Sequence, residues 1–308
     1  MTRPLFDRIA IIGLGLIGSS IARGVKARGL ARQVAGYDLS PEVRKRAREL
    51  GFCDEIADTP EAVVAGASLV VVAVPVGATA SAGEALAPHL AEDAIVTDVG
   101  SVKAAVIRQV LDKLPPRVAF VPGHPIAGTE HSGPDAGFAE LFEERWCILT
   151  PCERSTDAAV NKVTALWRGL GSAVENMTPE HHDIVLAITS HVPHLIAYNI
   201  VGTAADMEQV TQSEVVKFSA GGFRDFTRIA SSDPVMWRDV FLNNKEAVLE
   251  MLGRFSEDLA ALQRMIRWED GNALQELFTR TRAIRRGIIE AHQDTDLADF
   301  GRPHGHED

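Results

Sequence analysis

The stretch Ile9-Ala-Ile-Ile-Gly13-Leu-Gly15-Leu-Ile-Gly18 decides the fold of the first half of the chain. Its apolar start favours a buried strand, and three glycines follow at the spacing GxGxxG. Gly13 permits a tight turn, Gly15 lets backbone N–H groups approach a pyrophosphate, and Gly18 lets a helix pack closely on the sheet. The motif alone is a weak signal. With a strand before it and a helical stretch after it, it predicts a dinucleotide-binding turn.

Asp38 decides which nicotinamide cofactor the turn should bind. The apolar run Val34 to Tyr37 ends just before this residue, which lies 20 positions beyond Gly18. A carboxylate here accepts hydrogen bonds from the ribose 2′-OH and repels a 2′-phosphate. The next residues, Leu39 to Pro41, offer no cation for that phosphate. The sequence therefore predicts NAD in preference to NADP, although a plain turn residue would explain the residue type without the spacing.

The chain divides into two halves of different pattern. Short apolar runs alternate with helical stretches in the first half, which is typical of a parallel sheet with helices on both faces. The predicted strands are Ile9 to Ile12, Val34 to Tyr37, Leu69 to Val74, Ile95 to Asp98, Val118 to Val121, Trp146 to Leu149 and Ala173 to Glu175. After Met177 only helical periodicity follows. We therefore expect a Rossmann-like α/β domain over residues 1–177 and an all-helical domain over residues 178–308.

Prolines mark the helix starts of the second half. Thr178-Pro179-Glu180 combines an N-cap, a proline and an acid, and Pro193 should bend or end the helix that begins there. The residues His181, Ile184, Ile188 and His191 should share one face of it. The last helix should span Ala273 to Ala291, and the polar tail from about residue 294 should be disordered.

A second proline, Pro234, opens a helix that we expect to run unbroken to about Trp268. At 1.5 Å per residue this helix would be roughly 50 Å long. Its apolar seam comprises Val248, Leu252, Phe255, Leu259, Leu262 and Ile266. A helix longer than its domain must pack on something else. We therefore expect a homodimer built on the helical domain.

Composition argues against several classes of function. The 308 residues include 31 Lys and Arg against 42 Asp and Glu, a formal net charge of −11, and no basic run suits nucleic acid. We expect no apolar stretch that approaches the roughly 20 residues a bilayer requires, and Met1 to Arg8 lacks the apolar region of a secretory signal. The histidine pairs His181/His182 and His304/His306 lack a ligand at metal spacing. We expect a cytoplasmic enzyme for a small molecule, without metal, with three reduced cysteines.

Polar residues follow three predicted strands at the sheet edge where α/β proteins bind ligands. These segments are Val74-Pro75, Asp98 to Lys103 and Pro122 to Glu130. Ser101 and His124 are the hydroxyl and imidazole candidates among them. A lone histidine is more often structural than catalytic. One that closely follows a strand, between glycine and proline, is a candidate general base.

Four motifs resemble those of a known family. They are DVGSVK (98–103), GHPIAGTE (123–130), SHVPHLIA (190–197) and GGFRDFTRIA (221–230). In this order they are similar to prephenate and arogenate dehydrogenases, and the resemblance extends from Ile9 to about Phe255. It implies oxidation of prephenate, arogenate or both by NAD, with release of CO2 and formation of 4-hydroxyphenylpyruvate or tyrosine. Which acid is preferred stays open.

The resemblance implies roles for the matched residues. His124 matches a catalytic histidine that accepts the proton of the ring hydroxyl, and Ser101 matches a serine that contacts that hydroxyl and positions the cofactor. Arg228 matches an arginine that binds a substrate carboxylate, and His194 a histidine of the same pocket. A neutral imidazole suits the proton transfer, and a guanidinium suits a carboxylate. Arg224 could face the site too, but is more simply a surface residue.

Four residues have two interpretations each, and a fifth has one. His191 is a second pocket residue or a core histidine, and Thr129 belongs with the substrate by its place in GHPIAGTE. Lys103 and Glu130 are orienting groups or surface residues. The resemblance places the equivalent of Trp237 near the neighbouring subunit's pocket, with core packing as the alternative.

Two other functions compete with this one. A β-hydroxyacid dehydrogenase would need a lysine with an asparagine four residues later, which neither Lys217 nor Lys245 has. A non-catalytic NAD-responsive module would need neither His124 nor Arg228. The predicted cofactor site comprises Gly13, Gly15, Leu16, Ile17, Gly18, Asp38, Val74, Pro75 and Ser101.

Overall fold

The computed structural model describes residues 4–211, 219 and 221–290 of the 308-residue chain. The chain forms two compact units, Met1–Leu249 and Glu250–Asp308. The boundary expected after Met177 falls inside the first unit, which holds both the sheets and several helices, and it stays a prediction. The tail expected from about residue 294 lies outside the described residues.

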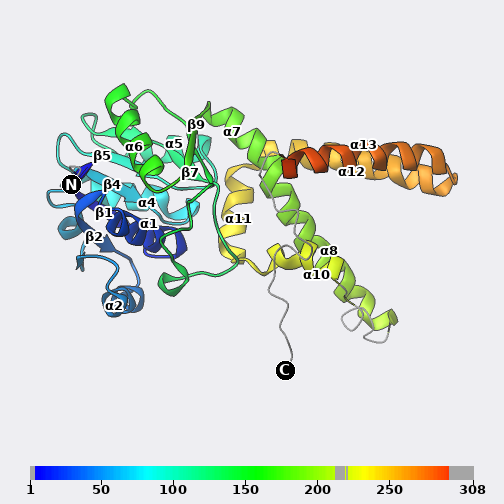
Figure 1. Ribbon diagram of the computed structural model, residues 1–308, viewed down its shortest axis with the longest axis horizontal. Helices are drawn as coiled ribbons and strands as arrows, with labels where there is room; N and C mark the ends of the chain where they lie inside the picture. The colour runs from blue at the N-terminus through cyan, green and yellow to red at the C-terminus, as the bar shows by residue number, and fades with distance from the viewer. Residues whose placement is uncertain (1–3, 212–218, 220, 291–308) are drawn as a thin grey trace. The chain divides into compact units, whose positions relative to one another are not determined.

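A six-stranded parallel sheet forms the centre of the first unit, in the order β3-β2-β1-β4-β5-β6 (Figure 1). The strands are β1 Phe6–Ile12, β2 Ala31–Tyr37, β3 Glu55–Ile56, β4 Leu69–Val72, β5 Ile95–Asp98 and β6 Ala119–Val121. Ile12 pairs with Tyr37 on one side and with Val72 on the other, so these strands end level with one another. The turn after β1 therefore lies beside Asp38 and the segment after β4. The sequence did not predict β3, which is only two residues long.

Alternate residues of β1 pack on the two faces of this sheet. Ile9 and Ile11 lie in one hydrophobic core with residues of α1 (Leu16–Ala27) and α6 (Asp157–Gly169). Ala10 and Ile12 lie in a second core with residues of α3 (Pro60–Val64) and α5 (Ala104–Leu111). Successive side chains of a strand point to opposite faces, so both faces are covered. The predicted α/β architecture is confirmed; its other two helices are α2 (Pro41–Leu50) and α4 (Thr79–Leu86).

A second, three-stranded sheet stands apart from the first. Its strands are β7 Gly123–Pro125, β8 Trp146–Leu149 and β9 Ala173–Asn176. The expectation of a single parallel sheet is therefore wrong for these strands, because β7 runs antiparallel to β8, with His124 opposite Ile148. Pro122 before β7 and Pro125 at its end conceal this strand in the sequence, since proline is unfavourable inside a sheet.

The first helix of the second half differs from the expectation in two ways. Thr178 caps α7 (Pro179–Leu186) as predicted, and its hydroxyl accepts the N–H of His181. Pro193 does not end the helix, which continues through a π-turn, Ala187–His191, into α8 (Val192–Thr211). The wider turn changes the helical phase. His191 is buried while Ile184 and Ile188 are 44% and 48% exposed, so the expected common face is wrong.

This helical run also corrects the expectation about membrane-length segments. By length and composition alone, Pro179–Met207 could cross a bilayer, and it is the one such helix among the described residues. The same composition occurs in core helices of proteins that never enter a membrane. The run carries buried polar residues that take part in the candidate site below.

The predicted unbroken helix from Pro234 is wrong as well. The structure has two helices, α11 (Pro234–Asn243) and α12 (Lys245–Arg267). Asn244 separates them with φ −111° and ψ 34°, outside the helical range. Its buried side-chain amide donates to the Asp183 carbonyl at 2.8 Å and to His191 Nδ1 at 3.1 Å. These tertiary bonds override a local sequence that is compatible with a continuous helix.

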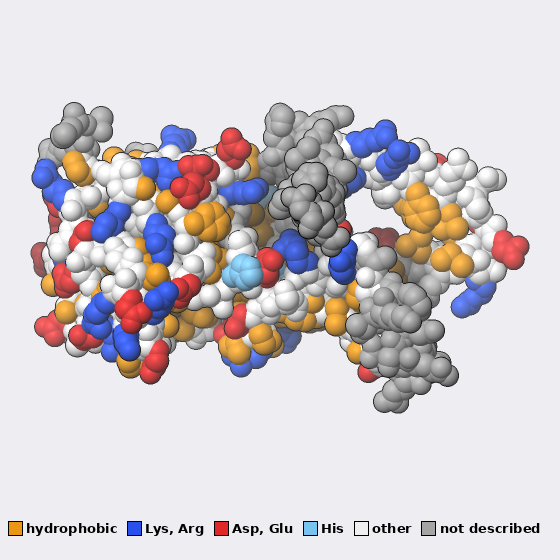
Figure 2. Space-filling model, turned by 60° about the horizontal axis from the view of Figure 1, so that its bottom comes forward, with side chains coloured by type: hydrophobic (Ala, Val, Ile, Leu, Met, Phe, Trp, Pro, Cys, Tyr) orange, Lys and Arg blue, Asp and Glu red, His pale blue; other side chains and the backbone are white. Residues whose placement is uncertain are grey.

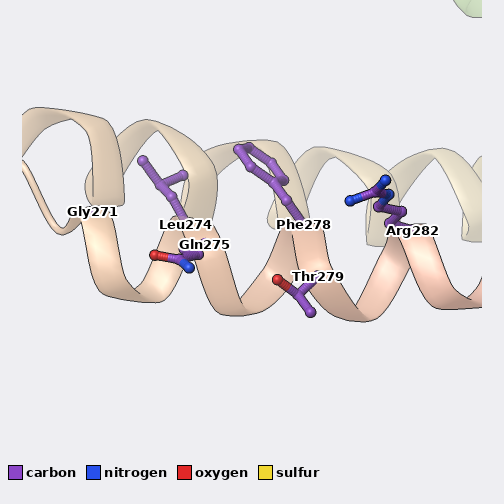
Figure 3. A pocket seen from close by; sticks show the side chains of 6 residues that line it. All are labelled: Gly271, Leu274, Gln275, Phe278, Thr279 and Arg282. Carbon is purple, nitrogen blue, oxygen red and sulfur yellow. The ribbon is translucent and has the colours of Figure 1, made fainter.

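In its described residues, the second unit consists of the rest of α12 and of α13 (Gly271–Glu290). Within the described residues 252–287 no side chain is buried. Hydrophobic side chains gather on the surface of these helices at the right of Figure 2. Leu274, Phe278 and Arg282 rise from one side of α13 around an open hollow (Figure 3). The unit therefore presents apolar surface that its own helices leave uncovered.

Candidate active site

The three glycines of the turn after β1 meet different surroundings. At Gly13, with φ +92°, a Cβ would lie 2.4 Å from the carbonyl oxygen of Ala73, and at Gly18 a Cβ would lie 1.9 Å from the carbonyl oxygen of Gly13. Both positions exclude any side chain. A Cβ at Gly15 would have no atom within 4 Å. Space is thus kept open at Gly15, where a bound cofactor would approach the backbone.

The N-terminus of α1 supplies donors to this open space. Gly15 is the N-cap of α1 and has no side chain to cap the helix. In an α-helix the first N–H groups, here those of Leu16, Ile17 and Gly18, lack intrahelical partners and favour an anion. Val74 also borders the turn, since its Cγ1 lies 3.1 Å from the Cβ position of Gly13. These residues fit a dinucleotide pyrophosphate.

Asp38 supports the same turn from the end of β2. Its Oδ2 accepts the N–H of Leu14 at 2.9 Å, and its Oδ1 accepts the N–H of Ser40 at 2.9 Å. One cation that the sequence analysis missed lies close by. Arg44 donates to the backbone carbonyl of Asp38 at 2.7 Å and pairs with Asp58. The carboxylate of Asp38 therefore both holds the glycine turn and carries negative charge at the expected ribose position.

His124 begins a chain of hydrogen bonds that the sequence analysis did not find. Its Nδ1 lies 2.8 Å from Nε2 of His182, and Nδ1 of His182 lies 2.8 Å from Oδ1 of Asp183. The exposed fractions of the three residues are 9%, 0% and 5%. The sequence analysis rejects His181/His182 as a metal site because no ligand lies at metal spacing, but it does not consider Asp183, the next residue, as a hydrogen-bond partner. The position of a histidine directly before an aspartate, in the first turns of a predicted helix, is the signal that could have indicated this chain of hydrogen bonds.

Asp183 and Lys103 hold this chain in place. Both carboxylate oxygens of Asp183 accept backbone N–H groups at the start of α5, from Lys103 at 2.8 Å and from Ala104 at 3.0 Å. The fully buried Lys103 ammonium pairs with Asp98 and donates to the Gly123 carbonyl at 2.6 Å. Of its two interpretations, the structure favours the orienting group. Lys103 connects the end of β5 to the strand that bears His124.

Burial keeps the histidines of the site neutral. It lowers the pKa of His124 well below its usual value, and the neighbouring His182 and Lys103 lower that pKa further. Burial likewise lowers the pKa of His191 to about 4. For His194, burial lowers the pKa, the Ser190 carbonyl opposes the shift, and the Arg228 charge adds to it. At neutral pH these rings are therefore acceptors and donors without charge.

His194 and Trp237 form a stacked pair within one chain. Their ring centroids are 3.7 Å apart at an interplanar angle of 25°, and Trp237 also meets His191 edge-on at 6.0 Å. His194 Nδ1 lies 2.8 Å from the Ser190 carbonyl oxygen. In this chain Trp237 lies against the chain's own histidines, and its expected place near a neighbouring subunit's pocket stays a prediction. His191 and Trp237 are buried, as core packing would also require.

Arg228 lies at the exposed side of this group. It is in a 3-10 turn, Arg228–Ser231, after α10 (Gly221–Thr227). Its Nη1 lies 2.9 Å from Oε2 of Glu130, and the two side chains are 53% and 32% exposed. Thr129, which precedes Glu130 in the chain, is exposed, and its hydroxyl accepts the N–H of His131 at 3.2 Å. Arg224 is exposed on α10.

Ser101 lies between the two halves of the site. It is half-buried in the segment that follows β5, and its backbone lies near the ring of His191. Pro75 follows Val74 after β4, beside the glycine turn. The structure thus brings Ser101, His124, His191 and the glycine turn to the same edge of the first unit. Their individual roles stay predictions.

Comparison with known proteins decides the family. The family model of the prephenate dehydrogenase nucleotide-binding domain matches residues 21–176, and that of the prephenate dehydrogenase dimerization domain matches residues 178–280. The chain belongs to the prephenate dehydrogenase family. The expected family, activity class and cofactor are confirmed: this family member is an NAD-dependent dehydrogenase of tyrosine biosynthesis.

Relatives of known activity cover nearly the whole chain. Cyclohexadienyl dehydrogenase of Zymomonas mobilis is 44% identical over 94% of this chain and 98% of its own length. Prephenate dehydrogenase of Aquifex aeolicus, solved with hydroxyphenyl propionate and NAD+, is 36% identical with a TM-score of 0.86, covering 94% of this chain and 99% of that one. Arogenate dehydrogenase of Synechocystis is 27% identical with a TM-score of 0.77, covering 91% and 99%. The prephenate dehydrogenase fold thus extends through both predicted domains.

Proposed function

We propose that this chain oxidises and decarboxylates prephenate, and that it also accepts arogenate. The observation that carries the proposal is the position of His124. It is a buried, neutral imidazole at the edge of the first unit that also bears the glycine turn. A base of this kind next to a nicotinamide site suits the removal of a hydroxyl proton coupled to hydride loss. The cyclohexadienyl dehydrogenase relative supports the wider substrate range.

The reaction balances with His124 as the group that exchanges the proton with the substrate. NAD, when bound, accepts the hydride from the ring carbon that bears the hydroxyl. His124 accepts the hydroxyl proton, so that this carbon becomes a carbonyl. The bond from the ring to its carboxylate then breaks, CO2 leaves, and the electron pair makes the ring aromatic. The ring oxygen takes the proton back from the imidazolium, which restores neutral His124.

The substrate would lie between His124 and Arg228. Arg228 uses only Nη1 in its ion pair with Glu130, so its other donors suit a substrate carboxylate. We assign the walls of this space to His194, His191, Trp237 and Thr129. Ser101 would contact the ring hydroxyl beside the cofactor. Asp38 and the glycine turn, with Val74 and Pro75, would hold NAD.

A homodimer completes the proposal. The second unit leaves large apolar side chains exposed, among them Ile266 at 64% and Phe278 at 57%. A family model named for dimerization matches residues 178–280. A second copy of the chain is the simplest partner for that surface. We place the enzyme in the cytoplasm.

The decisive experiment supplies each acid separately. With NAD present, prephenate should yield NADH, CO2 and 4-hydroxyphenylpyruvate in equal amounts, and arogenate should yield NADH, CO2 and tyrosine. Reaction with prephenate alone would narrow the activity to one acid. Absence of NADH with both acids, in protein shown to bind NAD, would refute the proposal.

A further inference from the structure

The hydrogen-bonded chain from His124 through His182 to Asp183 has no part in the proposed chemistry so far. We infer that Asp183, acting through His182, sets the tautomer of His124 so that its Nε2 meets the substrate without a proton. Both are positioning residues in this inference, because neither touches the reacting atoms. The inference rests on the proposed function, which it extends by naming how the base is prepared.

The argument starts at Asp183, which can act only as an acceptor. Each of its two oxygens already accepts a backbone N–H, from Lys103 and from Ala104. These amides open α5, where the helix dipole favours a negative charge. An ionised carboxylate has no proton to donate. The nitrogen of His182 that faces Asp183 at 2.8 Å, Nδ1, must therefore carry the proton.

The tautomer of His182 then determines that of His124. A neutral imidazole has one N–H, and burial lowers the pKa of His182, so the ring is neutral. With the proton on Nδ1, Nε2 of His182 is a bare acceptor. Nδ1 of His124, 2.8 Å away, must be the donor of that bond. Nε2 of His124 is consequently free of a proton and can accept one.

The charged neighbours of the two histidines support this assignment of protons. Among the described residues, the titratable groups that act on His124 are His182, Lys103 and His191, and none of these three is negative. Besides His124, those that face His182 are Asp183, Lys103 and Asp98. Lys103 pairs directly with Asp98, so the carboxylate free to influence the chain is that of Asp183. Negative charge therefore lies at the far end of the chain from the substrate.

The chain also provides a place for the proton once His124 has accepted it. When the substrate proton binds Nε2 of His124, the proton on its Nδ1 can pass to Nε2 of His182. The positive charge then sits on His182 in contact with the Asp183 carboxylate. No proton is gained or lost overall, and the reverse movement returns the proton to the phenolate oxygen. A fixed carboxylate behind a histidine stabilises the imidazolium form in the same manner in other enzymes.

The first test reads the tautomers without any substrate. In protein labelled with ¹⁵N in its histidine rings, NMR at neutral pH should show His124 protonated at Nδ1 only and His182 protonated at Nδ1 only. Asp183→Asn should redistribute these protons, because an amide can donate as well as accept. A wild-type spectrum with the His124 proton on Nε2 would overturn the inference.

The second test separates tautomer control from packing. His182→Leu removes the acceptor for His124 Nδ1, so kcat should fall roughly 10²-fold with little change in KM. His182→Gln places an amide oxygen near the former Nε2, so it should recover most of that loss. The control is His181→Leu, an equally apolar change at the exposed neighbouring position, which should leave kcat unaltered. Wild-type kcat and an unchanged pH profile in His182→Leu would contradict the inference.

The two tests also separate this inference from the proposed function. If neither acid yields NADH, the function fails while the NMR result still decides the tautomer. If His182→Leu does not fold, as judged by its thermal unfolding, the spectrum and His182→Gln decide. A His182→Gln enzyme as slow as one lacking His124 altogether would count against tautomer control, because it would mean that histidine itself is required at position 182.

Discussion

A single imidazole carries the proposed chemistry, so its replacement is the most direct prediction at the residue scale. His124→Asn keeps a polar group that can reach His182 but lacks the nitrogen that accepts the substrate proton. We expect kcat to fall roughly 10²- to 10⁴-fold with KM little changed. Steady-state kinetics with prephenate measures both. Full kcat with intact NAD binding would eliminate His124 as the base.

The pH profile of the same enzyme follows from its environment. Protonated His124 cannot act as a base, so wild-type activity should be present above the pKa of His124 and lost as the pH falls through it. Burial and positive neighbours lower this pKa. The acidic limb should therefore lie below the usual histidine value of about 6.5, not at it. The limb should be absent from the residual activity of His124→Asn.

Arg228 should affect binding more than turnover. A carboxylate contact that exists in both the ground state and the transition state mainly changes KM. Loss of a charged hydrogen bond, about 1.5 to 3 kcal/mol, corresponds to roughly a 10- to 150-fold rise in KM for Arg228→Ala. The control is Arg224→Ala on the adjacent exposed turn of α10. Equal effects of the two changes on KM would argue against a specific carboxylate site.

Asp38 should determine the cofactor. Asp38→Ala removes the expected acceptor for the ribose 2′-OH, so the Kd for NAD should rise roughly 10- to 150-fold, while NADP binding should improve. Arg44, already beside the Asp38 carbonyl, could then pair with the 2′-phosphate. Calorimetry with each cofactor measures both changes. The control is Asp7→Ala, near the start of β1 and therefore at the end of the strand away from the glycine turn. Equal binding of NAD and NADP by the wild-type enzyme would disprove the preference.

At this scale the sequence predicted the residues that local context marks. Glycines at the spacing GxGxxG, Asp38 beyond a strand, and His124 between glycine and proline all carry local signals. His182, Asp183 and Asn244 carry weak ones, because their importance comes from partners far along the chain. The hydrogen bond between Asn244 and Asp183, for example, spans 61 positions. One sequence contains no measure of such pairings.

At the scale of elements, the break between α11 and α12 makes a prediction of its own. Asn244→Ala would remove two buried hydrogen bonds and leave His191 Nδ1 without this donor, while the Asp183 carbonyl keeps the N–H of Ala187. We expect a loss of about 1 to 3 kcal/mol in the free energy of unfolding, measured by urea denaturation. Asn199→Ala, at an exposed position on α8, should change it little. A variant as stable as the wild type would show that packing alone breaks the helix.

Element boundaries were predictable where caps and prolines act locally. Thr178 and Pro179 start α7 where expected, and Asp233 caps α11 with its side chain. The π-turn before Pro193 and the short strand β7 were not predictable from the sequence, because each depends on tertiary packing. Strands of three residues between prolines resemble loops in any local pattern. The strand that carries His124 is thus among those that the sequence does not reveal.

At the scale of the whole molecule, the uncovered surface of the second unit predicts the oligomeric state. Leu259→Glu would place a charge in an apolar interface, which is unfavourable, so the dimer should dissociate or the chain unfold. Light scattering at micromolar concentration measures the mass. Gln263→Glu, an added charge at an exposed polar position of α12, should keep the dimer. A wild-type monomer under these conditions would rule the dimer out.

The prephenate dehydrogenase family, its cofactor and its α/β architecture followed from the sequence because four motifs preserve their order over most of the chain. The extent of the compact units did not. The first unit runs to Leu249, whereas the two family models meet between residues 176 and 178. The domain boundary after Met177 therefore stays a prediction. The periodicity of the sequence shows where the strands stop, but it does not show which later helices pack against those strands.

The hydrogen-bonded chain behind His124 has a consequence for how this enzyme can evolve. His124 lies in the segment matched by one family model, while His182 and Asp183 lie in the segment matched by the other. A recombinant gene that joined the first segment of one homologue to the second of another would carry a whole cofactor site. Its catalytic histidine would have the required tautomer only if the second segment supplied a histidine and a carboxylate at the positions of His182 and Asp183. Natural exchange of these segments should therefore favour crossovers between parents that share this pair.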